Sequence, residues 1–376
     1  MNIYMIMAAI VLFLALMMRG DLPQNRKFII WACILMFLVY GLRDAYTVGN
    51  DSASSYLHQF QRMETTTLAA LREGADLNDN LFWRLFARLG YIVLGGNYQL
   101  FITIISTFVM TVFGRFIFRY SVNPVQSLVY YWGLWFYTFN FSALKQSIAM
   151  TLILLAFDSV LDRRVVKFLI IILIATMFHF PSIIFLPAYW LVKLNPRREF
   201  LAILAAALLA VYLWRDQILN FMLQFYYEGQ EFLGQERFFT GKVIVMLTLV
   251  LVAYVLRPPS RYNRAYAASM QFVAVATVIQ LFSVYNNVFE RLADYYFQFS
   301  IIFVPFILDQ RSITPEERLP AITLAPYALG ALCLYRFNDV VTRTTTYLMP
   351  YKFFFQSTYV KEAIVQASSF MKTGWF

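Results

Sequence analysis

The chain has 376 residues, of which 60% are hydrophobic and 14% are charged, and its formal net charge is +10. Soluble globular domains have about 45–50% apolar and about 25% charged residues, so this composition excludes a soluble protein and predicts an integral membrane protein. The excess of Lys and Arg does not indicate nucleic-acid binding, because about half of these residues lie in short loops, where positive charge sets membrane topology.

About twelve apolar runs approach the roughly 20 residues that a membrane-spanning helix needs. These runs are residues 2–18, 28–42, 98–118, 125–140, 144–160, 165–178, 181–192, 200–214, 243–256, 267–285, 292–308 and 319–335. The first run lacks a basic leader and a small-residue cleavage site, so we expect a retained span. The pattern predicts an all-α polytopic protein of about twelve transmembrane helices, some short or broken, in a single bundle over residues 1–376.

Basic residues follow every second run and predict how the chain is oriented. Arg26 and Lys27 follow the first run, Arg115 and Arg119 end the third, and similar clusters follow the later ones. Short cytoplasmic loops are enriched in Lys and Arg, so these connections are assigned to the cytoplasm. The N-terminus and the longer connections are then expected on the outer face.

Three longer segments are predicted on that outer face. Residues 43–97 contain two amphipathic stretches, which suit helices lying in the membrane interface. Residues 215–242 have a similar mixture of aromatic and acidic residues, and residues 336–376 form an amphipathic C-terminal tail.

The stretch 165–192 is too short for two full spans and long for one. His179 and Pro181 lie at its middle, and basic clusters flank both ends. We expect two short helices that meet at an outer vertex, because broken helices are tolerated where they line a cavity.

Polar residues mark five candidate positions on the outer side. They are Arg43 with Gly49, Asp51 and Tyr56; Arg84 and Arg88; Asn140, Lys145 and Gln146; His179 and Ser182; and Glu290, Arg291, Asp294 and Tyr295. Each also fits a structural role, such as a basic side chain reaching the interface or an ion pair. Cationic side chains that converge at the outer leaflet suit an anionic group, above all a lipid-linked pyrophosphate.

No cluster has the carboxylate density of a Mg²⁺ site, so neither a metal ion nor another cofactor is expected. Cys33 and Cys333 both lie in apolar runs, where cysteine usually acts as a small hydrophobic residue.

Four of these stretches, in this order, resemble motifs of the EpsG family of Wzy-like bacterial polysaccharide polymerases. The matching residues are Leu42-Arg43 with Gly49, Asp51 and Tyr56; Asn140 with Lys145, Gln146, Ile148 and Ala149; His179 with Ser182; and Arg291 with Tyr295. Lys145 stands where the family usually has Arg. A Lys keeps the charge but not the bidentate fork.

The resemblance implies a GT-C-like membrane glycosyltransferase in the bacterial inner membrane, with its active site facing outward. It would transfer a growing glycan from undecaprenyl pyrophosphate to a lipid-linked repeat unit. Membrane lipid and a chain-length regulator are further candidate partners.

The implied reaction needs a base for the acceptor hydroxyl and cations for the leaving pyrophosphate. We assign the base to His179 or Asp51, with His179 favoured because histidine titrates near neutrality. Arg43, Lys145 and Arg291 are expected to bind pyrophosphate. The remaining candidates for substrate contact are Tyr56, Asn140, Gln146, Tyr295, Arg84 and Arg88.

Two other functions fit the same residues. A flippase or other transporter of lipid-linked sugars also needs cations in a cavity, although no internal repeat is visible. A membrane O-acyltransferase would use an intramembrane histidine, but His179 is predicted to face outward.

Overall fold

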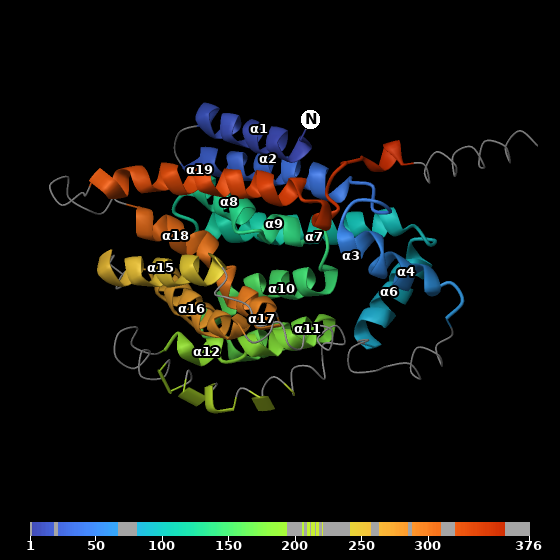
Figure 1. The fold of residues 1–376 in the computed structure, drawn as a ribbon. Coiled ribbons are helices and arrows are strands. Elements are labelled where there is room, and N and C mark those ends of the chain that lie inside the picture. The colour runs from blue at the N-terminus through green and yellow to red at the C-terminus, as the bar shows by residue number, and fades with distance from the viewer. Residues whose placement is uncertain are drawn as a thin grey trace, which may run out of the picture.

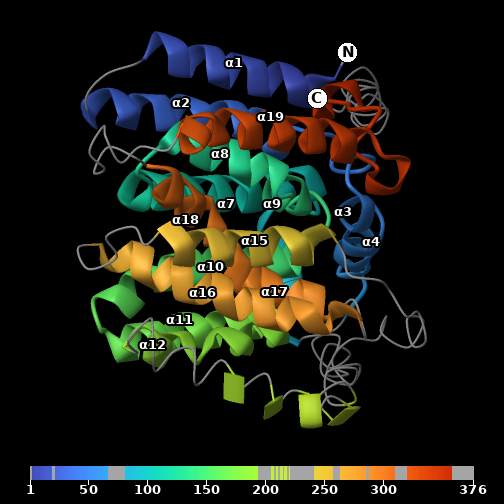
Figure 2. The same ribbon diagram turned by 60° about the vertical axis from the view of Figure 1, so that its left-hand side comes forward.

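The computed structural model describes residues 2–18, 22–66, 81–193, 241–256, 263–284, 288–309 and 320–357, with a few positions between 205 and 220. The described secondary structure is helical, apart from an isolated bridge between Arg43 and Phe353. The longer helices lie side by side (Figures 1 and 2). They are α1 (Ile3–Met17), α2 (Leu22–Gly41), α7 (Tyr98–Tyr120), α8 (Pro124–Gly133), α10 (Leu144–Leu161), α11 (Val165–Phe178), α15 (Gly241–Leu256), α16 (Arg264–Leu281), α17 (Val288–Phe297), α18 (Ser300–Leu308) and α19 (Pro320–Thr342).

Within the described residues, α7 and α10 are long and apolar enough to cross a membrane, and α17 with α18 adds a third candidate span if the bent pair is counted as one. Shorter apolar helices, among them α1, α11 and α15, accompany them. The all-helical prediction is confirmed, and the helices are consistent with a multi-pass membrane protein. The number of about twelve spans stays a prediction, because more than half of run 200–214 and most of loop 215–242 lie outside the described residues.

Two predicted runs are interrupted. Run 125–140 becomes α8 and the short α9 (Phe136–Phe139), because Trp135 between them has a left-handed backbone with φ of 75°. Run 292–308 is divided between α17 and α18, which are bent by 55°. The break leaves Gln298 buried between the two helices.

Residues 165–192 form the expected hairpin. Helix α11 ends at Phe178, since Pro181 has no N–H to continue the helical pattern. The chain returns through a 3₁₀ helix, Phe180–Phe185, and the single turn α12 (Ala188–Leu191), where a longer α-helix was expected. Arg163 Nη1 donates to the Tyr189 carbonyl at 2.6 Å, and Tyr189 Oη donates to the Arg163 carbonyl at 2.9 Å, which closes the hairpin.

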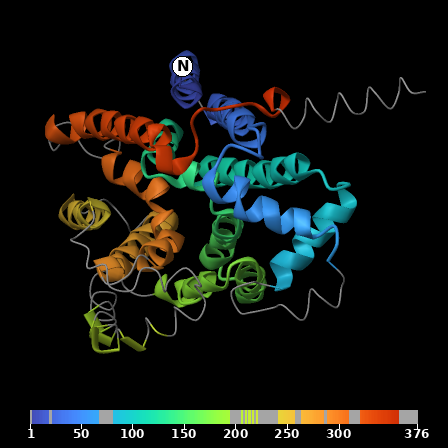
Figure 3. The same ribbon diagram turned by 45° about the vertical axis from the view of Figure 1, so that its right-hand side comes forward.

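Three short helices gather at one end of the bundle: α3 (Asn50–Ala53), α4 (Ser55–Arg62) and α6 (Leu81–Val93), shown in blue to cyan in Figures 1 and 3. Phe60 of α4 packs on Tyr98, at the start of α7, with 5.3 Å between ring centroids. Residues 336–342 of the predicted tail belong to α19, and residues 343–357 also reach this end, where the Phe354 N–H donates to the Leu42 carbonyl at 3.0 Å. The rest of the tail lies outside the described residues.

Candidate functional site

Four polar side chains from three separate stretches of sequence meet at the end of the bundle where α3, α4 and α6 lie. They are Lys145 in the first turn of α10, His179 at the vertex of the hairpin, and Arg291 and Tyr295 on α17. His179 Nδ1 shares a hydrogen bond with the Tyr295 hydroxyl. The positive charges of Arg291 and Lys145 both act on the His179 ring. We call these four residues the cationic site.

The local structure explains why these side chains converge. Arg291 and Tyr295 are four residues apart, so they lie on one face of α17. The Gln146 amide donates to the Arg291 carbonyl at 2.9 Å and fixes the start of α10 to α17. The sequence predicted Gln146 as a substrate contact. In the structure it is buried and joins two helices that carry the site.

His179 lies beyond the last residue of α11, in an extended conformation that ends the helix. Burial, and then the positive charges of Arg291 and Lys145, lower the pKa of His179 from 6.5 to about 3. The imidazole is therefore neutral at pH 7. One of its nitrogens then carries a proton while the other can accept one. The hydrogen bond with Tyr295 uses Nδ1.

An aromatic wall lies beside Lys145. Its Nζ is 5.9 Å from the centroid of the Tyr56 ring and 5.6 Å from that of Trp83. These two rings meet edge to face at 5.3 Å. Trp83 was not among the predicted site residues. It lies in the Phe82–Arg88 stretch, of which only Arg84 and Arg88 were predicted to contact the substrate.

Helix α6 also packs on the vertex of the hairpin. The rings of Phe82 and Phe86 lie 4.9 Å and 5.2 Å from that of Phe178, the residue before His179. Arg84 is half-buried on the same helix, and Arg88 Nη1 donates to the Met63 carbonyl. This bond ties α6 to the end of α4, whereas a substrate contact was predicted for both arginines.

A second charged cluster adjoins Arg291. Lys242, in the first turn of α15, places its Nζ 2.7 Å from Asp294 Oδ1 and 3.4 Å from Glu290 Oε1. The sequence groups both acids with Arg291, and in the structure both lie against Lys242. Sequence reasoning missed Lys242, because it follows a long connection and carries no motif.

Arg43 is completely buried, below the surface of the same end of the bundle. Its Nε donates to the Val48 carbonyl at 3.1 Å, its Nη2 donates to Ser52 Oγ at 3.2 Å, and its Nη1 donates to the Tyr40 carbonyl. The guanidinium also lies over the rings of Tyr40 and Phe141, at 4.8 Å from each centroid. This geometry favours a structural role, and pyrophosphate binding by Arg43 stays a prediction.

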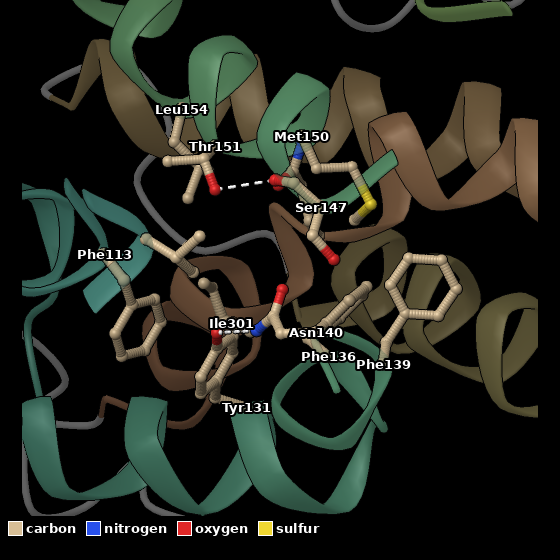
Figure 4. A pocket seen from close by; sticks show the side chains of 12 residues that line it. Phe113, Tyr131, Phe136, Phe139, Asn140, Ser147, Met150, Thr151, Leu154 and Ile301 are labelled. Carbon is tan, nitrogen blue, oxygen red and sulfur yellow. Dashed lines mark hydrogen bonds between the residues drawn. The ribbon is translucent and has the colours of Figure 1, made fainter. Parts of the chain in front are cut away.

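Asn140 and Asp51, two further predicted residues, have the following surroundings. The Asn140 amide donates to the Tyr131 hydroxyl at 2.7 Å, and Asn140 lines an internal cavity of about 20 Å³ together with Ser147 and Thr151 (Figure 4). Asp51 is half-buried in α3, in the turn that Arg43 holds. Within the described ranges, no group of three or more His, Cys, Asp and Glu side chains is placed to hold a metal ion.

Comparison with known proteins gives one match. No curated protein and no solved structure matches this sequence. The EpsG family matches residues 28–353, which include all four members of the cationic site and the whole of the Arg43 turn. Because this match covers most of the chain, the protein belongs to the EpsG family.

Proposed function

We propose that this protein is a polysaccharide polymerase, a membrane glycosyltransferase that uses a glycan linked to undecaprenyl pyrophosphate as its donor. The EpsG family is linked to exopolysaccharide synthesis. The observation that carries the proposal is the convergence of Lys145, His179 and Arg291, which come from separate parts of the sequence. Two cations beside a neutral imidazole suit the transfer of a sugar from a pyrophosphate to a hydroxyl group.

Lys145 and Arg291 bind the pyrophosphate in this proposal. Arg presents a planar fork that matches two phosphate oxygens, whereas Lys acts as a compact point charge. Both positive charges stabilise the negative charge that develops on the pyrophosphate as it leaves, and this lowers the free-energy barrier of the transfer. The aromatic wall of Tyr56 and Trp83 keeps the Lys145 ammonium in place and offers flat faces on which sugar rings can stack.

His179 accepts the proton of the acceptor hydroxyl. The acceptor oxygen forms a bond to the anomeric carbon as the bond from that carbon to the pyrophosphate oxygen breaks. The leaving lipid pyrophosphate takes the electron pair of the broken bond, and the proton passes to the imidazole. In this proposal Nδ1–H donates to the Tyr295 oxygen, and Nε2 carries the lone pair that takes the proton.

Substrate binding would change the basicity of His179. With the site empty, burial and the charges of Lys145 and Arg291 keep the pKa of His179 low. A bound pyrophosphate offsets both positive charges and so raises the pKa of His179, while burial, the larger cause, continues to lower it. Binding of the donor lipid therefore makes His179 a stronger base.

The test is chain extension by the purified protein with a lipid-linked repeat unit, read as a ladder of products. We expect Lys145→Ala combined with Arg291→Ala to abolish the ladder. Arg62→Ala, which removes an exposed positive charge from α4 at the same end of the bundle, should leave it intact. A full ladder from the double variant would refute the proposal. Wild-type protein that moves the lipid-linked unit across vesicles but extends no chain would instead be a transporter.

A further inference from the structure

A groove of about 670 Å³ lies between α2 and α7. The two helices run antiparallel. The Thr103 hydroxyl, near the start of α7, donates to the carbonyl of Gly41 at the end of α2, at 2.9 Å. At the other end, the Arg26 guanidinium lies 6.0 Å from the centroid of the Phe118 ring. Ile30 and Ile34 are exposed along the groove, so it opens to the outside of the bundle.

The chemistry of the groove changes along its length. Most of its wall is apolar and comes from Ile29, Ile30, Ile34, Phe37 and Met110. Basic residues line it near one end only, where Arg26 of α2 and Arg115 of α7 are found. A long apolar groove with cationic side chains at one end is complementary to an amphiphile that has an apolar chain and one anionic group.

This basic end keeps a net positive charge. Arg115 Nη2 is 2.6 Å from Asp158 Oδ2, and Arg119 Nη1 is 2.7 Å from the same oxygen. One carboxylate therefore faces two guanidinium groups, and Arg26 adds a further positive charge close by. The side chain of Arg115 is half exposed, so it can reach an anionic group without leaving Asp158.

The groove is separate from the cationic site. Arg115 lies 17 residues along α7 from Tyr98, which is about 25 Å at the rise of an α-helix. The cationic site lies at the Tyr98 end. Basic loops assign the Arg115 end to the cytoplasmic side of the membrane. An anionic group bound there belongs to the leaflet opposite the one in which we place the donor lipid.

We propose that this groove binds an anionic phospholipid of the cytoplasmic leaflet, with an acyl chain along the apolar wall and the phosphate between Arg26 and Arg115. Anionic lipids are the amphiphiles that basic residues between helices select on that side of a membrane. The lipid would cover Ile30 and Ile34 and support the contact between α2 and α7. This inference does not depend on the enzymatic reaction.

Native mass spectrometry of the purified full chain tests the proposal, with phosphatidylglycerol compared with phosphatidylcholine of the same acyl chains. We expect the wild-type protein to retain phosphatidylglycerol preferentially. Arg26→Gln and Arg115→Gln should each weaken that binding about fivefold, the contribution of one basic residue near an anionic surface. Lys27→Gln and Lys167→Gln each remove one exposed charge at the same end of the bundle but outside the groove, and they should leave the preference unchanged.

A second variant tests the apolar part of the groove without changing its charge. Thr111 is exposed and lines the groove, so Thr111→Phe should fill it and release phosphatidylglycerol while the thermal unfolding midpoint stays near that of the wild type. Equal retention of the two lipids by the wild type would overturn the proposal. So would equal losses in the groove variants and their controls, or unchanged binding in Thr111→Phe.

Discussion

At the residue scale, the imidazole of His179 has two separable properties, because it forms a hydrogen bond with Tyr295 and can also accept a proton. His179→Asn keeps a side chain that forms hydrogen bonds and removes the base. We expect the rate of chain extension to fall about 10²–10⁴-fold, the usual contribution of a general base, with donor binding little changed. The measurement is the initial extension rate at saturating donor.

Tyr295→Phe is the matched control for His179→Asn. It removes the hydrogen bond to the ring but leaves the base, so its effect should be clearly smaller. A rate within tenfold of the wild type for His179→Asn would show that His179 is not the base, and Asp51 would become the next candidate.

Lys145 allows a test of how the pyrophosphate is held. Lys145→Met removes the charge and should raise the KM for the lipid-linked donor at least about tenfold, because a hydrogen bond to a charged group is worth roughly 1.5–3 kcal/mol. Lys145→Arg, which keeps the charge and adds a bidentate fork, should keep the KM at or below that of the wild type. An unchanged KM in Lys145→Met would show that Lys145 does not bind the donor.

Arg43 illustrates what a sequence can reveal about a single residue. An arginine at the end of an apolar run, followed by glycine and aspartate, indicates that the charge is used. This pattern does not show whether the arginine binds a ligand or another group of the protein. Its hydrogen bonds go to the backbone carbonyls of Tyr40 and Val48, and because every residue has a backbone carbonyl, the sequence does not reveal them. His179, Arg291 and Tyr295, which were predicted on the same side of the membrane, lie together in the structure, whereas Trp83 and Lys242 required the three-dimensional structure.

At the scale of elements, the turn between α2 and α3 depends on Gly49. Its φ is +101°, and a Cβ atom placed there would lie 2.3 Å from the Phe141 carbonyl oxygen. Gly49→Ala should therefore destabilise the protein by about 2–4 kcal/mol, from the left-handed backbone and the collision together. The midpoint of unfolding in detergent, followed by tryptophan fluorescence, measures this loss.

Gly95 provides the control for this substitution. It also has a positive φ, of +59°, but a Cβ atom there would meet nothing within 4 Å. Gly95→Ala should cost only about 1–2 kcal/mol, which isolates the backbone contribution. Equal effects of the two substitutions would mean that the close approach of Gly49 to Phe141 is not a significant constraint.

The lengths of several helices followed from hydropathy alone. Run 165–178 coincides with α11, and runs 98–118 and 144–160 end within two residues of α7 and α10. The breaks in α8–α9 and α17–α18 did not follow, because the apolar pattern continues through them. The hairpin at His179 was predictable, since Pro181 gives a local reason for α11 to end.

At the scale of the whole molecule, the two ends of the bundle differ in chemistry. One end carries the cationic site, and the other carries Arg26 and Arg115. A single bundle with outer-face helices was predicted, and the described helices α3, α4 and α6 do gather at one end. The GT-C-like likeness stays a prediction, because no solved structure matches the chain. Hydropathy gives the elements of such a bundle, but their lateral order depends on side-chain packing that a single sequence does not reveal.

The orientation of the bundle in the membrane can be tested with single cysteines after Cys33 and Cys333 have been replaced by Ala. Lys27 and Ser54 are exposed, and the part of α2 between them, residues 28–41, is 14 residues long and extends about 21 Å. The connection 42–53 adds to this separation, and Lys27 lies in a basic cluster assigned to the cytoplasm, so the two positions should lie on opposite sides of the membrane. We expect a membrane-impermeant maleimide to label Ser54→Cys in intact cells, and Lys27→Cys only after permeabilisation. The reverse pattern would place the cationic site in the cytoplasm, where a polymerase that acts on the outer leaflet could not work.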